Sequence, residues 1–116
     1  MQRKFRLTRS TDFKRVRRFG KSYAHPLVVL IVQPSEGSNL RVGVTAGKTV
    51  GFAVRRNRAK RLLRAAVRPL LVDLAPGCDL LLIARQPLTE ANLEETRAAL
   101  QSLLRRARLS PAPDDR

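Results

Sequence analysis

The segment Lys48–Leu71, KTVGFAVRRNRAKRLLRAAVRPLL, decides how this chain folds, and it holds eight basic residues and no acidic one. Seven of the eight lie between Arg55 and Arg68. At about 100° per residue, a helix over this segment gathers its apolar side chains in one arc, which we expect to pack against a sheet. The arc consists of Ala59, Leu62, Leu63, Ala66, Val67 and Leu70.

The opposite side of the predicted helix is almost purely cationic. Like charges three or four residues apart repel by a few tenths of a kcal/mol per pair, and no acid in the segment offsets this repulsion. Guanidinium groups bind phosphate through paired hydrogen bonds, and an amide among them suits a base edge or a 2′-hydroxyl. We therefore interpret this side as a phosphate-binding face. It comprises the stripe Asn57, Arg61, Arg64 and Arg68, with Arg58 and Lys60 beside it.

The charge of the whole chain is segregated along the sequence. The 116 residues carry 24 lysines and arginines against nine aspartates and glutamates, a net charge of +15. Residues 1–72 hold 18 basic and two acidic residues, whereas residues 73–116 hold six basic and seven acidic ones. Solubility alone does not require such segregation, but a polyanion-binding face does. The length suits one domain, which we place at residues 1–108, followed by a flexible tail at 109–116.

Several classes of protein are disfavoured by the sequence pattern. No apolar run approaches the roughly 18–20 residues that cross a bilayer, and no apolar stretch follows the basic N-terminus as it would in a signal peptide. Cys78 is the only cysteine and His25 the only histidine, so neither a thiolate metal site nor a nucleophile–base pair can be assembled. We expect a cytoplasmic protein that makes no membrane contact and has no catalytic or metal site of its own.

The other segments alternate between helices and strands. Apolar spacing and β-branched content predict helices at 9–19 and 92–108 and strands at 27–32, 40–45 and 80–84. We expect the first two strands to pair with each other. The order α-β-β-α-β-α predicts an α/β (α+β) two-layer sandwich, in which helices pack on a small mixed sheet.

Individual residues mark the ends of these elements. Ser10 or Thr11 is expected to cap the first helix, and Gly20 to stop it. Asn92 and Glu95 have the spacing of a capping box at the start of the last helix.

The segment Ala53–Arg64, AVRRNRAKRLLR, resembles the "RNR" signature of the protein subunit of bacterial ribonuclease P. Other stretches agree in order: RLTRSTDFKRV is similar to the family's first helix, LRVGVTAGKTVGFAV to its strand, loop and helix entry, and DLLLIAR to its later strand. The resemblance spans about residues 5–106. The pattern A-V-x-R-N-x-x-K-R-x-x-R is matched at every fixed position, namely Ala53, Val54, Arg56, Asn57, Lys60, Arg61 and Arg64.

This resemblance implies a ribonucleoprotein whose RNA subunit is the catalyst and cleaves the 5′ leader from precursor tRNA with magnesium, which the RNA and the substrate mainly hold. It implies a left-handed βαβ crossover, whereas the general rule predicts a right-handed one. Phe13, Arg17 and Lys48 would contact the leader between the first helix and the sheet. The side chains expected to contact the ribonuclease P RNA are Arg56, Asn57, Arg58, Lys60, Arg61, Arg64 and Arg68.

Two positions depart from the family pattern. The family often has aromatic residues at the position of Arg17 and near Ile31. Stacking on aromatic side chains contributes roughly 1–3 kcal/mol per base to the binding of single-stranded RNA. We therefore expect Arg17 to substitute for a ring by stacking its guanidinium or by contacting a phosphate. Three other phenylalanines are expected to pack in the core or against loops: Phe5, Phe19 and Phe52.

Two other classes of function remain open at this point. A ribosomal-type or chaperone RNA-binding protein would share the charge and the fold but leave cleavage of precursor tRNA unchanged. A protein-only hydrolase would still cleave after the RNA had been digested. Duplex DNA is not an expected partner, because strands and a glycine-bearing loop precede the basic helix, in place of the first helix of a helix-turn-helix.

Overall fold

The computed structural model describes residues 6–35, 39–74 and 77–109. The predicted helices and strands are all present in the predicted order, and a short strand, β1, is added after the first helix. In chain order the elements are α1 (Ser10–Phe19), β1 (Lys21–Ala24), β2 (Val28–Pro34), β3 (Leu40–Ala46), η2 (Lys48–Val50), α2 (Ala53–Val67), η3 (Arg68–Asp73), β4 (Cys78–Ala84), η4 (Gln86–Glu90) and α3 (Leu93–Arg106), where η denotes a 3-10 helix.

The strands form one mixed sheet in the order β1-β2-β4-β3. β2 pairs antiparallel with β1 and with β4, whereas β3 pairs in parallel with β4. The prediction that the strands at 27–32 and 40–45 pair with each other is therefore wrong, because β4 lies between them. The reason is burial: six of the seven residues of β4 are buried, more than in any other strand, and a central position covers a strand on both sides.

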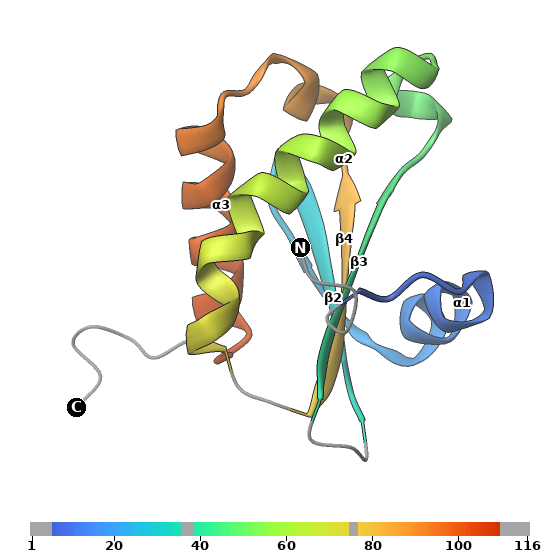
Figure 1. Cartoon of the computed structure of the whole chain (residues 1–116), viewed down its shortest axis with the longest axis vertical. Coiled ribbons are helices and arrows are strands. Elements are labelled where there is room, and N and C mark those ends of the chain that lie inside the picture. Colours follow the sequence, from blue (N-terminus) through green and yellow to red (C-terminus); the bar gives the residue numbers. More distant parts are fainter. Residues whose placement is uncertain (1–5, 36–38, 75–76, 110–116) are drawn as a thin grey trace.

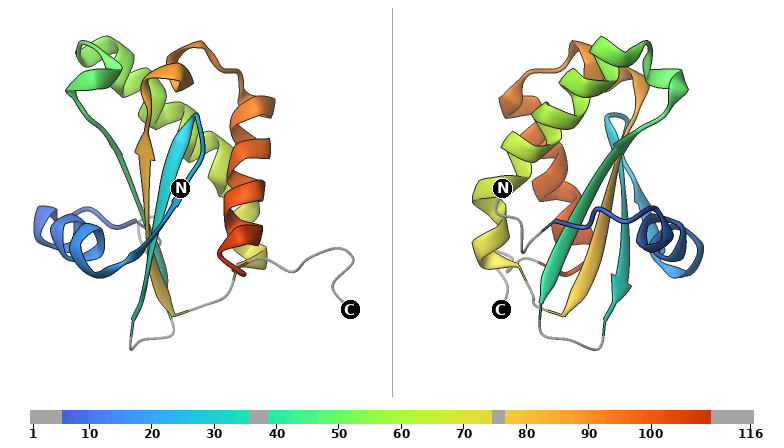
Figure 2. Two further views of the ribbon diagram at one scale, coloured as in Figure 1. Left: turned by 180° about the vertical axis from the view of Figure 1, so that it is seen from behind. Right: turned by 45° about the vertical axis from the view of Figure 1, so that its right-hand side comes forward.

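Helices cover both faces of the sheet. α1 lies on one side, and α2 and α3 lie together on the other (Figure 1), an arrangement that the two further views confirm (Figure 2). α2 connects the parallel neighbours β3 and β4, so the chain makes a βαβ crossover. Its left-handed sense stays a prediction from the resemblance.

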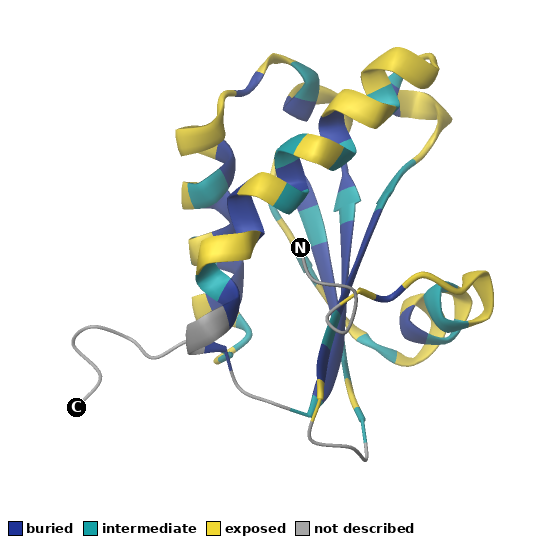
Figure 3. Cartoon of the chain, viewed as in Figure 1, coloured by how far each residue is buried: buried dark blue, intermediate teal, exposed yellow. Residues whose placement is uncertain are grey.

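Two apolar clusters occupy the two faces of the described sheet. The predicted arc of α2 is confirmed, because its side chains are buried or half-buried in the larger cluster, together with α3. Figure 3 shows the buried sides of α2 and α3 turned toward the sheet and their exposed sides turned outward. The smaller cluster lies beneath α1 and consists of Leu7, Val16, Ile31 and Leu81, with Phe13 half-buried against it.

The ends of the first helix differ in part from the prediction. Arg9 is the N-cap of α1 and no side chain caps it, so the predicted cap by Ser10 or Thr11 is wrong. Gly20 ends the helix as predicted, but with an extended backbone at φ −79°. Glycine is needed there for space, because a Cβ would come within 2.6 Å of both the Ile31 side chain and the Val16 carbonyl oxygen.

The start of α3 confirms its prediction. The Glu95 amide donates to Asn92 Oδ1 at 2.8 Å, and the Asn92 amide donates to Glu95 Oε1 at 2.9 Å, which completes the capping box. At the other end, Leu109 packs against the larger cluster. The rest of the predicted tail, residues 110–116, lies outside the described residues.

Two of the phenylalanine predictions are wrong. Phe19 is 66% exposed and Phe52 is 89% exposed, so neither packs in the core, and Phe5 lies outside the described residues. Phe19 instead lies beside Arg18, whose guanidinium carbon is 5.4 Å from the ring centroid. Within 6–35, 39–74 and 77–109, no helix is both long enough and apolar enough to cross a membrane.

Candidate nucleic-acid interface

Half of the predicted binding side chains of α2 are exposed to solvent. The outward face carries no acidic residue, because the whole helix, AVRRNRAKRLLRAAV, contains none. Asn57, Arg58 and Arg61 are exposed, as is Arg68 just after the helix. The structure therefore brings together a continuous set of hydrogen-bond donors and positive charges. The remaining predicted residues, Arg56, Lys60 and Arg64, are half-buried.

Arg58 lies on the flank of α2 that faces η4. Its Nη1 donates to the Thr89 carbonyl oxygen at 2.9 Å, which ties α2 to η4. A small hollow beside this bond is lined by Arg55, Arg58, Thr89 and Glu90. Arg58 thus has a structural role in addition to the contact with RNA that the sequence predicts.

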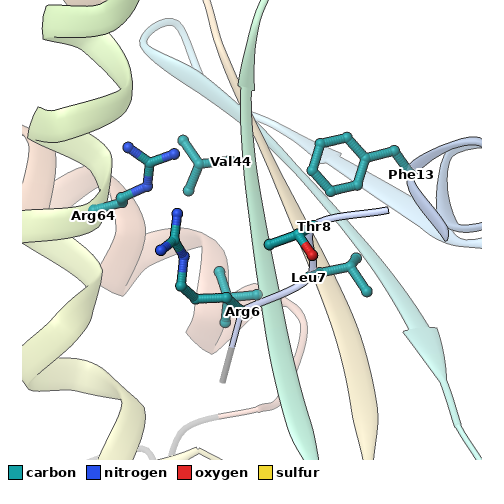
Figure 4. Close-up of a pocket in the computed structure, with 7 residues that line it drawn as sticks. Arg6, Leu7, Thr8, Phe13, Val44 and Arg64 are labelled. Atoms are coloured by element: carbon teal, nitrogen blue, oxygen red, sulfur yellow. The ribbon is translucent and has the colours of Figure 1, made fainter. Parts of the chain in front are cut away.

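Arg64 lies on the opposite flank, toward the edge of β3, and is not fully part of the exposed stripe. The N-terminal segment runs along this edge, where the Leu7 amide donates to the Val42 carbonyl oxygen at 2.8 Å. Burial, and to a lesser degree the charge of Arg6, lower the pKa of Arg64. A pocket of about 240 Å³ opens here, lined by Arg6, Leu7, Thr8, Phe13, Val42, Val44 and Arg64 (Figure 4).

The predicted leader-binding residues are not gathered in one pocket. Phe13 lies over Gly43 of β3, where an added Cβ would come within 2.6 Å of the ring. Arg17 is exposed one turn further along α1, and Lys48 is exposed beyond the end of β3. Since β3 continues three residues past Gly43, Lys48 lies roughly 10 Å or more from Phe13.

A strip of the sheet lies between Phe13 and Lys48. It is formed by Val29, Ile83 and Thr45, which are neighbours on β2, β4 and β3 and are all half-buried. Ile31 lies one row closer to α1 and is only 5% exposed. Ile31 is therefore a core residue and presents no surface to a ligand, so this chain has neither of the two additional aromatic rings that the family often has.

An ion network fixes α1 to the sheet. Arg41 of β3 donates from Nε and Nη2 to the two carboxylate oxygens of Asp79 on β4, at 3.0 Å each. Arg15 of α1 donates to Asp79 Oδ2 at 2.7 Å, to Asp12 Oδ1 at 3.1 Å and to the side-chain oxygen of Gln33 on β2. Burial alone would raise the pKa of Asp79, but the hydrogen bonds from Arg41 and Arg15 outweigh it and lower the pKa.

The described residues do not assemble a ligand set for magnesium. No three side chains of the His, Cys, Asp or Glu types come together in the part of the chain that the structure describes. Asp12 and Asp79, which lie near each other, are already engaged by guanidinium groups. His25 Nδ1 accepts a hydrogen bond from the Leu27 amide at 3.1 Å, which is a local turn contact. Cys78, the first residue of β4, is buried.

Fold and surface together define a small basic α/β domain, in which one helix presents a cationic face and another is clamped to the sheet. The family model of ribonuclease P matches residues 1–108. The ribonuclease P protein component of Herpetosiphon aurantiacus is 39% identical over 121 aligned residues, which cover 100% of this chain and 98% of that protein.

Solved structures agree with this match. The Staphylococcus aureus RNase P protein aligns with a TM-score of 0.81 at 27% identity and covers 92% of this chain and 98% of that one. The Thermotoga maritima RNase P protein aligns with a TM-score of 0.77 at 28% identity and covers 87% and 96%. The chain belongs to the ribonuclease P protein family. Membership places it in a tRNA-processing endoribonuclease complex and implies the ribonuclease P RNA as its partner.

Proposed function

We propose that this chain binds the catalytic RNA of ribonuclease P through the exposed face of α2, and the 5′ leader of precursor tRNA through α1 and the neighbouring strip of the sheet. It thereby assists magnesium-dependent removal of the leader, which gives mature tRNA 5′ ends. The observation that carries this proposal is the outward face of α2, which is cationic, free of acids and borne on a chain that matches the ribonuclease P family over residues 1–108.

The physical basis of RNA binding is charge neutralisation. Each phosphate that an arginine or lysine neutralises releases counterions, and this release drives association at moderate salt. Arg61 and Arg68 are exposed and can neutralise phosphates directly, and the exposed Asn57 beside them adds a neutral hydrogen-bonding group. Bound to the RNA subunit, such a protein reduces the repulsion between that RNA and a second polyanion, the substrate. We therefore expect its effect to be largest when magnesium is scarce.

Leader binding rests on a smaller set of groups. Phe13 offers a half-buried ring, Arg17 an exposed guanidinium and Lys48 an exposed ammonium group, placed on both sides of the half-buried strip. Arg17 supplies the stacking plane or phosphate contact at a position where the family often has a ring. The leader would follow the strip from α1 toward Lys48.

We assign the cleavage step itself to the RNA subunit. The magnesium ions belong to the RNA and its substrate, where phosphate oxygens supply the hard ligands that magnesium prefers. The role of this chain is to bind and position the two RNA molecules.

The experiment that tests the RNA-binding face is a salt titration. Affinity for ribonuclease P RNA is measured for the wild type and for the double variant Arg61→Ala with Arg64→Ala. Each lost phosphate contact reduces the slope of log K against log salt by roughly 0.7–0.9, so the double variant should lose nearly two units. The matched control is Arg105→Ala, an exposed arginine at the end of α3. An unchanged slope in the double variant would show that this face does not meet the RNA.

A further inference from the structure

The pocket at the edge of β3 brings two arginines from distant parts of the sequence together. Arg6 comes from the N-terminal segment and Arg64 from α2, and both guanidinium groups extend into the same space beside Val44 (Figure 4). The bridge between Arg6 and Val42, with the backbone hydrogen bond of Leu7, holds the N-terminal segment in this place.

No described carboxylate neutralises this pair of cations. The ion pairs among the described residues involve Arg15 and Arg41 and are formed on the α1 face of the sheet. Arg64 is half-buried, and the positive charge of Arg6 repels the positive charge of Arg64. Two like charges held close together cost free energy in the free protein, and an anion between them would remove that cost.

The pocket also lies where the two proposed RNA-binding surfaces meet. Arg64 belongs to the α2 surface, whereas Phe13, across β3 in Figure 4, belongs to the leader surface. β3 is the edge strand of the sheet, and no described strand pairs with its outer edge beside Val44. An RNA strand that passes from one surface to the other would cross at this point.

The geometry points to a phosphate-binding subsite at the edge of β3, in which Arg6 and Arg64 together hold one phosphodiester of RNA. Charge-assisted hydrogen bonds from two planar guanidinium groups suit the oxygens of a phosphate, and the exposed Thr8 hydroxyl lies in the same pocket. The RNA part of this inference rests on the proposed function, whereas the anion-binding part does not.

The anion site is tested on the isolated chain with inorganic phosphate. Thermal unfolding is followed for the wild type, Arg6→Gln and the control Arg105→Gln, in phosphate and in chloride of equal ionic strength. In chloride, Arg6→Gln should unfold at the same or a higher temperature, because one of two repelling charges is gone. In phosphate, the wild type and the control should gain stability, and Arg6→Gln should gain less, consistent with roughly tenfold weaker phosphate binding.

A purely structural role for Arg6 predicts a different pattern, namely a lower midpoint in chloride and an unchanged gain in phosphate. That pattern, or equal gains in Arg6→Gln and Arg105→Gln, would overturn the site. Arg64→Gln serves as a second variant, because it removes the other guanidinium of the pair and should show the same loss of phosphate response.

The source of the phosphate is tested in the assembled ribonucleoprotein. Arg6→Gln is compared with the wild type for binding to ribonuclease P RNA, to precursor tRNA and to mature tRNA. Weaker binding of the RNA subunit, with a salt slope reduced by roughly 0.7–0.9, assigns the phosphate to the catalytic RNA. A loss confined to precursor tRNA assigns it to the leader.

If all three affinities are unchanged, the pocket binds free phosphate only, and the proposal that an RNA strand crosses the edge of β3 at this pocket is refuted. Failure of the wild type to bind ribonuclease P RNA would instead contradict the proposed function, and the anion-binding site would be unaffected by that result.

Discussion

The substitution Asp79→Asn tests how α1 is held against the sheet. The Asp79 side chain is 1% exposed and accepts three hydrogen bonds from Arg15 and Arg41. Asparagine keeps the size of the side chain but removes its charge and turns an NH₂ group toward guanidinium donors. The contact that α1 makes through Arg15 and the two contacts that β3 makes through Arg41 are thus weakened together.

The expected loss of stability follows from the exposure of the groups left behind. Removing one partner of a buried ion pair costs about 3–5 kcal/mol when the remaining charge stays buried. Here the side chains of Arg15 and Arg41 are 33% and 38% exposed and can turn toward water. We therefore expect a loss of about 2–3 kcal/mol in the free energy of unfolding, or roughly 8–12 °C in the unfolding midpoint of a domain of this size.

The effect should also depend on pH in a defined direction. Because folding lowers the pKa of Asp79, the folded state binds this proton less tightly than the unfolded state does. The contribution of the carboxylate is therefore complete above the unfolded pKa of about 3.9 and is lost as the pH falls through the folded value. The difference in stability between the wild type and Asp79→Asn should be constant from pH 7 to about pH 5 and should shrink below about pH 4.

Denaturant unfolding of the wild type, Asp79→Asn and Asp12→Asn measures this effect. Asp12 pairs with the same arginines but its side chain is 21% exposed, so its removal should cost less than about 1 kcal/mol. Amide hydrogen exchange should become faster in α1 of Asp79→Asn and remain slow in α2, which packs on the opposite face. Equal losses in the two variants, or uniform exchange across both helices, would refute the view that Asp79 clamps α1.

Two further substitutions probe the proposed leader surface and the packing beside it. Arg17→Ala should weaken binding of precursor tRNA by the assembled enzyme while leaving the affinities for mature tRNA and for ribonuclease P RNA unchanged; equal losses for mature tRNA would contradict the leader assignment. Gly20→Ala should destabilise the fold by about 1–3 kcal/mol in thermal unfolding, because its Cβ would overlap the Ile31 side chain and the Val16 carbonyl. Gly47→Ala, where no atom lies within 4 Å of the added Cβ, is the control and should be close to neutral, and a comparable loss there would show that backbone freedom matters more than space.

Local patterns in the sequence predicted the elements well. The apolar arc of α2 and the capping box of Asn92 and Glu95 depend only on residues a few positions apart, and both are confirmed. Strand pairing depends on which segment is buried most deeply, and β4 displaces the pairing expected between β2 and β3. β1 was missed because KSYA has four residues and little apolar content.

The site was predicted less completely, for reasons of distance along the chain. Asp79 meets Arg15 across 64 residues, and Arg6 meets Arg64 across a similar span, so no spacing rule joins them. The basic N-terminus was the one signal that pointed to Arg6. Exposure of Phe52, next to the signature helix, also depends on the arrangement of η2 and α2, which short-range patterns do not determine.

We propose that this chain assists a ribonuclease P RNA in removing tRNA leaders. The most direct test of this proposal is cleavage of precursor tRNA at low magnesium by a bacterial ribonuclease P RNA, with and without this protein. We expect the protein to restore cleavage at the mature 5′ end and to have no activity without the RNA. Binding to the RNA with no change in cleavage would contradict the proposed function and indicate a general RNA-binding protein. Cleavage by the protein alone would contradict the assignment of catalysis to the RNA.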